Sequence, residues 1–414
     1  MKLNYLAILL SSSLCASSFE IQKPLQSELE SDAPAYRDDL VSLHQSLVEI
    51  SSISYDEHDV GDFLIEYLTA RNFVAERQFL PNDTSTSSSP DTAGKPRFNV
   101  VAWPAGQAKP HAPSPKLLVS SHIDTVPPFI PYARTDATPN AETVISGRGS
   151  VDAKASVAAQ VVAVTQLLDA GRVDPADVML LFVVGEERTG DGMRRFSDAR
   201  VARGLAPDLQ AAVFGEPTEG KLACGHKGFF GCDVTARGRA GHSGYPWLGK
   251  SATELLMRAL VKALDADLGS SEEFGNTTIN VGTLEGGVAA NVIPERASAQ
   301  IAGRVAIGPE LEGGKIVADR LRDVLTSVDE EAFEIECRNG YGVVKCECDV
   351  DGFDTITVNY GTDVPNLKGN MTRYLYGPGT IFVAHGPDEA LKLKDLETAV
   401  EDYKKLIEHA LKSK

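Results

Sequence analysis

Helical and strand-like patterns of apolar residues alternate along the chain from about residue 36 onward. Apolar residues recur at helical spacing from Tyr36 to Ile50, and a second helical stretch covers residues 59–70. Residues 82–96 are rich in Ser, Thr and Pro, which predicts a loop. The pattern therefore predicts two helices followed by a loop.

Beyond this loop, short apolar runs alternate with helical stretches, which is the pattern of an α/β domain with a mainly parallel sheet. An Ala- and Val-rich helix is expected over residues 153–168, ending before Gly171, and a long closing helix from about Asp388. The expected strands cover residues 98–103, 116–121, 178–184, 211–214 and 381–384.

The pattern changes again between residues 228 and 340, where strand-like and helix-like runs suggest an inserted α+β domain. A length of 414 residues fits two such domains. We therefore expect an α/β fold in which the first domain comprises residues 36–227 and 341–414 and the inserted domain residues 228–340.

Side chains that commonly bind metal ions follow directly after the apolar strands. In open α/β sheets, ligands bind beyond the carboxyl ends of the strands. We therefore expect these side chains to meet at one edge of the sheet. The residues concerned are His122, Glu186, Glu187, Glu216 and His385.

Two aspartates add to this set. Asp124 stands two residues after His122, so both side chains can point the same way, and a carboxylate is the usual partner of a metal-binding imidazole. Asp152 lies near a helix start after a glycine-flanked loop, where a plain helix cap is the alternative.

Glu186 and Glu187 are adjacent carboxylates, which repel each other unless a cation or a raised pKa relieves them. In a metallohydrolase, one such residue binds the metal and its neighbour takes a proton from water. Two zinc ions about 3.5–4 Å apart would need a bridging ligand, and Asp152 can supply it. A donor set without thiolates suits zinc, and Co²⁺ or Mn²⁺ would also be accepted.

The net charge of the chain bears mainly on which partners it can bind. The chain has 40 basic and 58 acidic residues and a formal net charge of −18. This balance argues against nucleic acid or an anionic membrane as a partner.

The first 18 residues are typical of a secretory signal peptide. Lys2 precedes an apolar run over residues 3–10, and small residues follow around Cys15. An ordinary N-terminal helix is the alternative. We therefore expect a secreted protein with a signal peptide over residues 1–18 and a leader or pro-segment over residues 19–35.

Export would leave an odd number of cysteines, so at least one is free or pairs elsewhere, and their connectivity stays open. These are Cys224, Cys232, Cys337, Cys346 and Cys348. Asn82, Asn276 and Asn370 begin glycosylation triplets, so we expect them at the surface of a glycoprotein.

The segments that carry the candidate ligands resemble the M20 metallopeptidase family, which includes carboxypeptidases, aminoacylases, acetylornithine deacetylase and succinyl-diaminopimelate desuccinylase. The likeness covers roughly residues 36–414, and its motifs occur in the same order. They are residues 121–127, 147–154, 185–187, 215–218 and 384–385. One departure is that Ala155 and Ser156 stand where many relatives carry two glycines.

The resemblance implies two zinc ions per subunit. It implies that Glu186 is the catalytic base and that the ligands are His122, Asp152, Glu187, Glu216 and His385. The residues themselves indicate that Asp124 orients His122.

The inserted domain resembles the family's lid, which often also forms the dimer contact, so we expect a homodimer. His242 matches a lid histidine that stabilises the oxyanion. Asn291 and Arg304 match positions that hold a substrate carboxylate, for which Arg is suited as a bidentate donor.

The function that follows from the resemblance is hydrolysis of the amide bond next to a C-terminal residue by a secreted zinc carboxypeptidase. An aminoacylase or an acetylornithine deacetylase-like enzyme acting on N-acyl amino acids is the alternative, and the export signal favours peptides. A non-catalytic zinc-binding protein is a further alternative, which the retention of Glu186 argues against.

Overall fold

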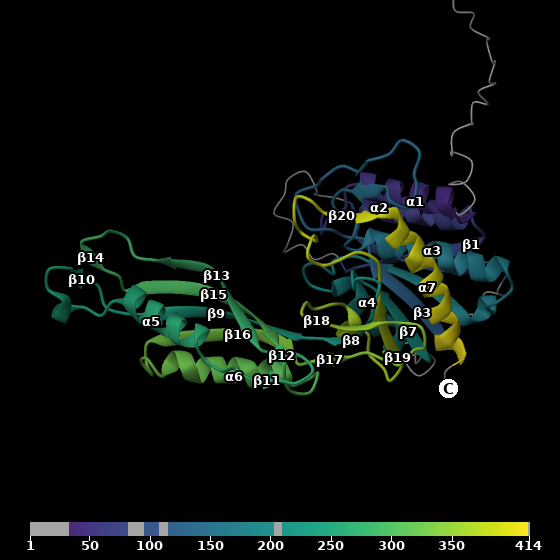
Figure 1. Cartoon of the computed structure of the whole chain (residues 1–414). Coiled ribbons are helices and arrows are strands. Elements are labelled where there is room, and N and C mark those ends of the chain that lie inside the picture. Colours follow the sequence, from purple (N-terminus) through teal and green to yellow (C-terminus); the bar gives the residue numbers. More distant parts are fainter. Residues whose placement is uncertain (1–32, 82–94, 107–114, 203–208, 413–414) are drawn as a thin grey trace, which may run out of the picture. The chain divides into compact units, whose positions relative to one another are not determined.

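The computed structural model describes residues 33–81, 95–106, 115–202 and 209–412. The expected signal peptide, nearly all of the expected leader, and Asn82 lie outside the described residues. Tyr36–Lys414 forms one compact unit. Its secondary structure includes a large mixed sheet and a separate antiparallel sheet (Figure 1).

The large sheet has nine strands, and the four at its centre (β6, β3, β7 and β19) run parallel. Antiparallel strands flank them on both sides. The α/β fold class is thus confirmed. In spatial order the strands are β1 (Phe73–Phe79), β2 (Phe98–Pro104), β6 (Val178–Val183), β3 (Leu117–His122), β7 (Ala211–Gly215), β19 (Thr372–Tyr376), β8 (Leu222–His226) and β17 (Val344–Lys345), with β18 (Thr355–Val358) also paired to β8.

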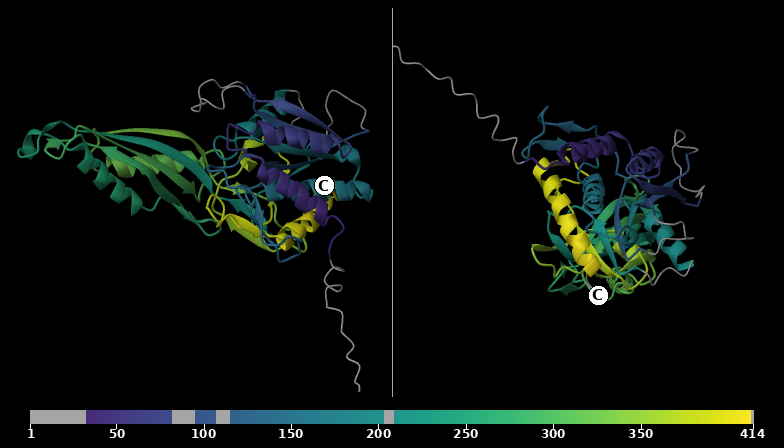
Figure 2. Two further views of the ribbon diagram at one scale, coloured as in Figure 1. Left: turned by 90° about the horizontal axis from the view of Figure 1, so that it is seen from above. Right: turned by 90° about the vertical axis from the view of Figure 1, so that its right-hand side faces the viewer.

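The central strands are continuous apolar runs because both faces of the sheet are covered. In β3, Leu117 and Val119 belong to the core on one face, and Leu118 to the core on the other. Helices α1 (Arg37–Glu49), α3 (Lys154–Asp169) and α7 (Leu393–Lys412) pack together on the first face (Figures 1 and 2). Helix α2 (His58–Thr69) packs on β1 and β2, and α4 (Asp191–Ala202) contributes to the second core.

The register of the central strands aligns their carboxyl ends. His122 in β3 lies opposite Val183 in β6, and Ser121 lies opposite Gly215 in β7. Tyr376 in β19 also lies opposite Gly215. The segments that follow these four strands therefore begin at one edge of the sheet.

The strand expected over residues 381–384 is wrong, because these residues form turns. The fourth parallel strand is instead β19, where Tyr374, Leu375 and Tyr376 are buried between β7 and β8. The apolar run at 381–384 is flanked by Gly and Pro residues, which favour turns. Phe382 is 85% exposed, so the run is not part of the core as a central strand would be.

The closing helix also begins later than expected, at Leu393, because β20 (Ala390–Lys392) pairs with β5 (Val144–Ser146) before it. β4 (Ala133–Arg134) completes this three-stranded sheet. Short 3₁₀ turns cover Pro175–Asp177, Pro246–Leu248 and Val364–Asn366.

The second sheet is antiparallel and carries two helices packed side by side on one face (Figure 1). Its strands are β13 (Thr278–Gly286), β15 (Arg296–Val305), β9 (Gly228–Arg237) and β16 (Phe333–Tyr341), and its helices are α5 (Ala252–Leu264) and α6 (Gly313–Thr326). Two short strand pairs belong to the same segment, β10 (Gly241–His242) with β14 (Val292–Ile293) and β11 (Ser270–Ser271) with β12 (Gly275–Asn276). We call residues 228–341 the lid segment.

Two disulfides settle the connectivity that the sequence left open. Cys232 pairs with Cys337 across β9 and β16, and Cys224 pairs with Cys348. Among the described cysteines, Cys346 is the free one, and burial raises the pKa of its thiol to about 12. A thiol with so high a pKa is a poor nucleophile at neutral pH.

No helix within the described residues is long and apolar enough to cross a membrane.

Gly215 allows β7 to approach α3, and its replacement tests this contact. A Cβ atom at this position would lie 2.6 Å from Gln160 Nε2 and 2.6 Å from Ser156 Cβ. We expect Gly215→Ala to lower the free energy of unfolding by about 1–3 kcal/mol, measured by denaturant titration, because overpacking forces the two elements apart.

Gly282→Ala is the matched control for this substitution. The nearest heavy atom to a Cβ at Gly282 is 3.8 Å away, which is ordinary contact, so we expect a change within about 0.5 kcal/mol. Equal stability of the two variants would contradict the close packing of β7 on α3.

Candidate metal centre and active site

The site is built around Asp152, in the loop that precedes α3. Its Oδ1 lies 3.0 Å from Nε2 of His122, the last residue of β3, and its Oδ2 lies 3.3 Å from Nε2 of His385. The two oxygens of one carboxylate thus face two different imidazoles. This is the arrangement that a ligand shared between two metal ions requires.

Each imidazole also faces a second carboxylate. His385 Nε2 lies 3.0 Å from Glu187 Oε2, and His122 Nε2 lies 3.9 Å from Glu216 Oε1. Glu187 follows β6 and Glu216 follows β7, the two strands that pair with β3 on either side. The structure therefore brings together all five residues that were expected to be ligands.

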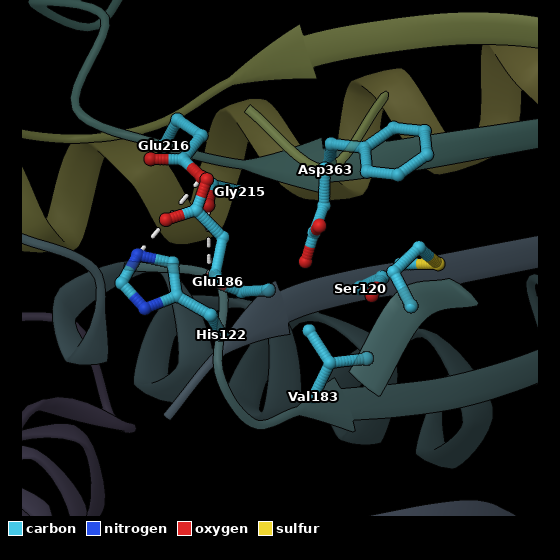
Figure 3. Close-up of a pocket in the computed structure, with 10 residues that line it drawn as sticks. Ser120, His122, Val183, Glu186, Gly215, Glu216 and Asp363 are labelled. Carbon is cyan, nitrogen blue, oxygen red and sulfur yellow. Dashed lines mark hydrogen bonds and ion pairs between the residues drawn. The ribbon is translucent and has the colours of Figure 1, made fainter. Parts of the chain in front are cut away.

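Glu186 lies on the same side of the site as His122 and Glu216 (Figure 3). The three line a small pocket that Asp363 completes, with its carboxylate directed between Glu186 and Ser120. Asp363 was not foreseen from the sequence, because it follows no apolar strand. It is buried, its Oδ1 accepts a hydrogen bond from Asn366, and its Oδ2 has no partner among the described residues.

Burial and mutual repulsion govern the protonation of these carboxyl groups. Burial, followed by the charge of Glu216, raises the pKa of Glu186 well above its ordinary range. Burial raises the pKa of Glu216 in the same way, and burial with the charge of Asp152 raises that of Glu187. Without a cation, protons must occupy part of the site.

The nearby carboxylates raise the pKa values of the two histidines. Burial disfavours the charged form of His122, but its contacts with Asp124 and Asp152 outweigh this and raise its pKa. Hydrogen bonds with Asp152 and Glu187 raise the pKa of His385 to about 10. Both imidazoles therefore hold a proton where a metal ion would otherwise sit.

The donor set fits divalent metal ions. Two groups have donor atoms within 4.8 Å of one another: His122 with Glu186 and Glu216, and His122 with Asp152 and Glu187. His122 Nδ1 faces the main-chain carbonyl of Asp124 at 2.9 Å. Because that nitrogen then carries the proton, the neutral form of the ring presents the Nε2 lone pair to the carboxylates, and only a cation or a second proton relieves the repulsion.

The carboxylate of Asp124 has a wider role than orienting one histidine. Its two oxygens accept hydrogen bonds from the main-chain N–H groups of Glu186 and Glu187 and from the Ser54 hydroxyl. Its Oδ1 is 3.6 Å from His122 Nδ1. Asp124 therefore connects the end of β3 to the turn after β6.

Gly185 makes that turn possible. Its φ is +76°, and a Cβ atom there would lie 2.1 Å from Asp191 Oδ1 and 2.6 Å from Arg97 Nη2. Arg97 in turn binds both Asp191 and the buried Glu57. A residue without a side chain is required where these charged groups close around the backbone.

Comparison with known proteins shows the family of this chain. A model of the peptidase dimerisation domain matches residues 224–332. An M20 peptidase domain-containing protein of Sordaria macrospora is 57% identical over 92% of this chain and 86% of its own length. A protein of Aspergillus oryzae named as a probable carboxypeptidase is 47% identical over 90% of this chain and 87% of its own length. The chain belongs to the M20 peptidase family.

A solved M20 family metallo-carboxypeptidase from Sulfolobus solfataricus superposes with a TM-score of 0.65. The two are 16% identical, and the match covers 90% of this chain and 99% of the other. At this identity the likeness concerns the fold alone. The departure from many M20 sequences, Ala155 and Ser156, lies buried in the first turn of α3, where small side chains are accommodated.

The lid segment holds the three residues expected to touch the substrate. His242 in β10 is exposed and contacts residues of its own segment, accepting a hydrogen bond from Gly244 N and stacking edge-on against Tyr245. The carbonyl of Asn291 binds Ser243 N, so both residues lie at the same end of the lid segment.

Arg304 lies elsewhere in the lid segment, on β15. A Cβ atom at Gly361 would lie 3.5 Å from Arg304 Nη1 and 2.3 Å from the Tyr341 hydroxyl. Gly361 is two residues from Asp363, which lines the pocket. The structure thus brings Arg304 toward the large sheet, whereas His242 and Asn291 contact lid residues.

The raised pKa values of the imidazoles predict that metal affinity increases with pH. His385, with a pKa of about 10, is protonated at neutral pH and must lose that proton to bind a metal. We expect the apparent affinity for Zn²⁺ to rise from pH 6 to pH 9, by up to about tenfold per pH unit for each proton displaced. Calorimetric titration in buffers of different ionisation enthalpy measures both the affinity for Zn²⁺ and the number of protons released.

The same pKa sets the sign for the stability of the metal-free protein. Because the folded value lies above the ordinary one, the contribution of His385 is complete below about pH 6.5 and is lost as pH rises through about 10. An affinity that is constant from pH 6 to 9, without proton release, would contradict this description of the site.

Proposed function

We propose that this M20 peptidase is a secreted, zinc-dependent carboxypeptidase that holds two metal ions and cleaves the amide bond next to a C-terminal residue. The observation that carries the proposal is the placement of Asp152, whose two oxygens each face a different imidazole. Relatives named as probable carboxypeptidases support the choice of reaction.

The ligands divide evenly around the shared carboxylate. His122 and Glu216 would complete one ion's ligands, and Glu187 and His385 the other's, which gives three protein ligands to each ion. That number is typical of catalytic zinc sites, and the absence of thiolates among these donors is compatible with zinc. When bound, the ions would polarise the scissile carbonyl and lower the pKa of water.

Glu186 is not needed as a ligand in this assignment. One of its carboxylate oxygens nevertheless lies within 4.8 Å of donor atoms of His122 and Glu216, close enough to share a metal ion with them. We assign it as the general base. Its raised pKa lets the carboxylate accept a proton from the attacking water and return it to the leaving amine nitrogen. Asp124 fixes the main chain of Glu186 and so the position of this base.

Arg304 is the candidate for binding the substrate carboxylate. A guanidinium can bind a carboxylate with two parallel hydrogen bonds. A peptide and an N-acyl amino acid both carry this carboxylate, so Arg304 would serve either substrate. A carboxypeptidase and an N-acyl amino acid amidohydrolase therefore differ in the group on the carbonyl side of the cleaved bond, which is a peptide in one and a simple acyl group in the other.

Export rests on the N-terminal pattern of Lys2 followed by an apolar run. The two disulfides support it, because such bonds persist mainly in oxidising compartments. Asn276 and Asn370 are exposed, as glycosylation at these positions would require.

A homodimer through the lid segment is the proposed assembly. On α5, Met257, Val261 and Leu264 are each more than half exposed and recur at helical spacing. The neighbouring strand β13 lies at the edge of its sheet, with main-chain groups available for pairing. A second copy of the chain would cover both features, and His242 would then act on the partner's site.

Replacing the base tests the mechanism. We expect Glu186→Gln to keep two zinc ions and to lower kcat by about 10²–10⁴, because the amide cannot accept the proton. Metal analysis and steady-state kinetics measure these two results.

The neighbouring residue provides the matched control. Glu187→Gln should lose zinc as well as activity, because it removes a ligand. A Glu186→Gln enzyme with full activity would exclude Glu186 as the base.

A substrate panel separates carboxypeptidase from deacylase. Dipeptides, N-acetylated amino acids and acetylornithine would be incubated with the zinc-loaded enzyme and with the chelated enzyme. We expect release of C-terminal amino acids from the peptides, lost on chelation. If only the N-acetylated compounds are hydrolysed, the proposed mechanism stands and the substrate is an N-acyl amino acid instead of a peptide.

The dimer is tested by charge on α5. The double variant Met257→Glu with Val261→Glu should sediment as a monomer where the wild type sediments as a dimer, because burying two carboxylates in an apolar contact is unfavourable. A wild-type monomer with full activity would exclude the dimer and the action of His242 on the partner's site.

A further inference from the structure

A buried ion pair between Arg148 and Glu389 lies next to the candidate metal centre, in contact with the main chain of Asp152. The two residues are 241 positions apart in the chain, and their side chains are 3% and 1% exposed. Arg148 Nη1 donates to Glu389 Oε2 at 2.7 Å. Arg148 precedes Asp152 by four residues, and Glu389 follows His385 by four, so the pair joins the two loops that carry these ligands.

Glu389 holds the loop of the shared ligand. Its Oε1 accepts hydrogen bonds from the main-chain N–H groups of Val151, at 3.0 Å, and of Asp152 itself, at 3.1 Å. Its main-chain carbonyl accepts two more, from Ser150 Oγ and Gly147 N. One glutamate therefore fixes the backbone on which the bridging carboxylate stands.

Arg148 holds the loop of the last ligand. Its Nη2 donates to the His385 carbonyl at 3.3 Å, and its Nη1 also donates to the Gly386 carbonyl at 3.1 Å. His385 has a φ of +64°, a conformation that residues other than glycine adopt rarely and keep only where their surroundings hold them. The guanidinium binds the backbone at this unfavourable position.

We propose that Arg148 and Glu389 are positioning residues that set the separation of Asp152 and His385, and thereby the affinity of the second metal ion. The inference rests on the proposed two-metal function. The hydrogen bonds of the pair reach the loops of Asp152 and His385, whereas Asp124 connects His122 to the turn of Glu187. Asp152 is shared by both ions, whereas His385 is a ligand of the second ion alone. The contacts of Arg148 with the His385 turn therefore make the second ion, bound by Asp152, Glu187 and His385, depend on the pair more than the first.

The burial of the pair predicts that glutamine cannot take the place of Glu389 without losing hydrogen bonds. A buried ion pair is stable only when its remaining donors and acceptors are satisfied, and here the carboxylate accepts three hydrogen bonds. A glutamine at position 389 would have to turn its NH₂ group either toward Arg148 or toward the two main-chain N–H groups. In both orientations two donors face each other.

The test is a Zn²⁺ titration of the metal-free full-length protein in the presence of a competing chelator. For Glu389→Gln we expect the dissociation constant of the second zinc ion to rise about 10–100-fold, the usual effect of losing a hydrogen bond that orients a ligand. The first ion, which shares Asp152 but not His385, should weaken by a smaller factor. A loss of general stability alone would weaken both ions equally, so the difference between them is the decisive quantity.

Arg148→Lys is the second variant and carries the test if Glu389→Gln does not fold. Lysine keeps the charge opposite Glu389 but cannot reach both carbonyl groups of the His385 turn, so it should also weaken the second ion selectively. Glu408→Gln is the control. It removes an ion pair with Arg172 that joins distant parts of the chain at an exposed position, and both affinities should be unchanged.

Equal affinities of wild type and both variants for the second ion would overturn the proposal, as would an equal weakening of both ions. A wild-type protein that binds fewer than two zinc ions is a different result. It would overturn the two-metal function itself, and with it this inference.

Discussion

Buried carboxylates that face one another need a cation or a proton between them, and the arrangement of the candidate metal centre depends on this constraint. Asp152 and Glu187 lie close together beside His122, Glu186 and Glu216 lie close together on its other side, and burial raises the pKa values of all three glutamates. In the metal-free state, the protons on His122 and His385 supply part of the compensation. A pair of divalent cations would supply it fully. The fold thus carries an electrostatic cost that metal binding would relieve.

The surroundings of the site keep this repulsive arrangement in place. Asp124 ties the end of β3 to the turn after β6, and Arg97 closes around Gly185 in the same turn. On the other side, Arg148 and Glu389 fasten the two remaining ligand loops. Most of these contacts use main-chain groups, so they fix the backbone and leave the ligand side chains free to face the metal.

The lid segment follows a different principle. Its sheet and helices enclose a separate core of small and aliphatic residues, reinforced by the Cys232–Cys337 disulfide. The apolar stripe on α5 and the edge strand β13 remain exposed, so this segment has surface to offer a partner.

The sequence by itself determined the α/β class and three candidate ligands, His122, Glu187 and Glu216, because parallel strands end on one side of the sheet and the polar residues there stand out against apolar runs. His385 was named correctly as part of the cluster but for the wrong local reason, since no strand precedes it. The sequence pattern failed at residues 381–384, where an apolar run forms turns and β19 takes the place in the sheet. Only the tertiary structure decided which imidazole each oxygen of Asp152 faces, which cysteines pair, and that Asp363, Arg148 and Glu389 surround the site. These depend on contacts between residues from 30 to 241 positions apart, which local periodicity does not encode.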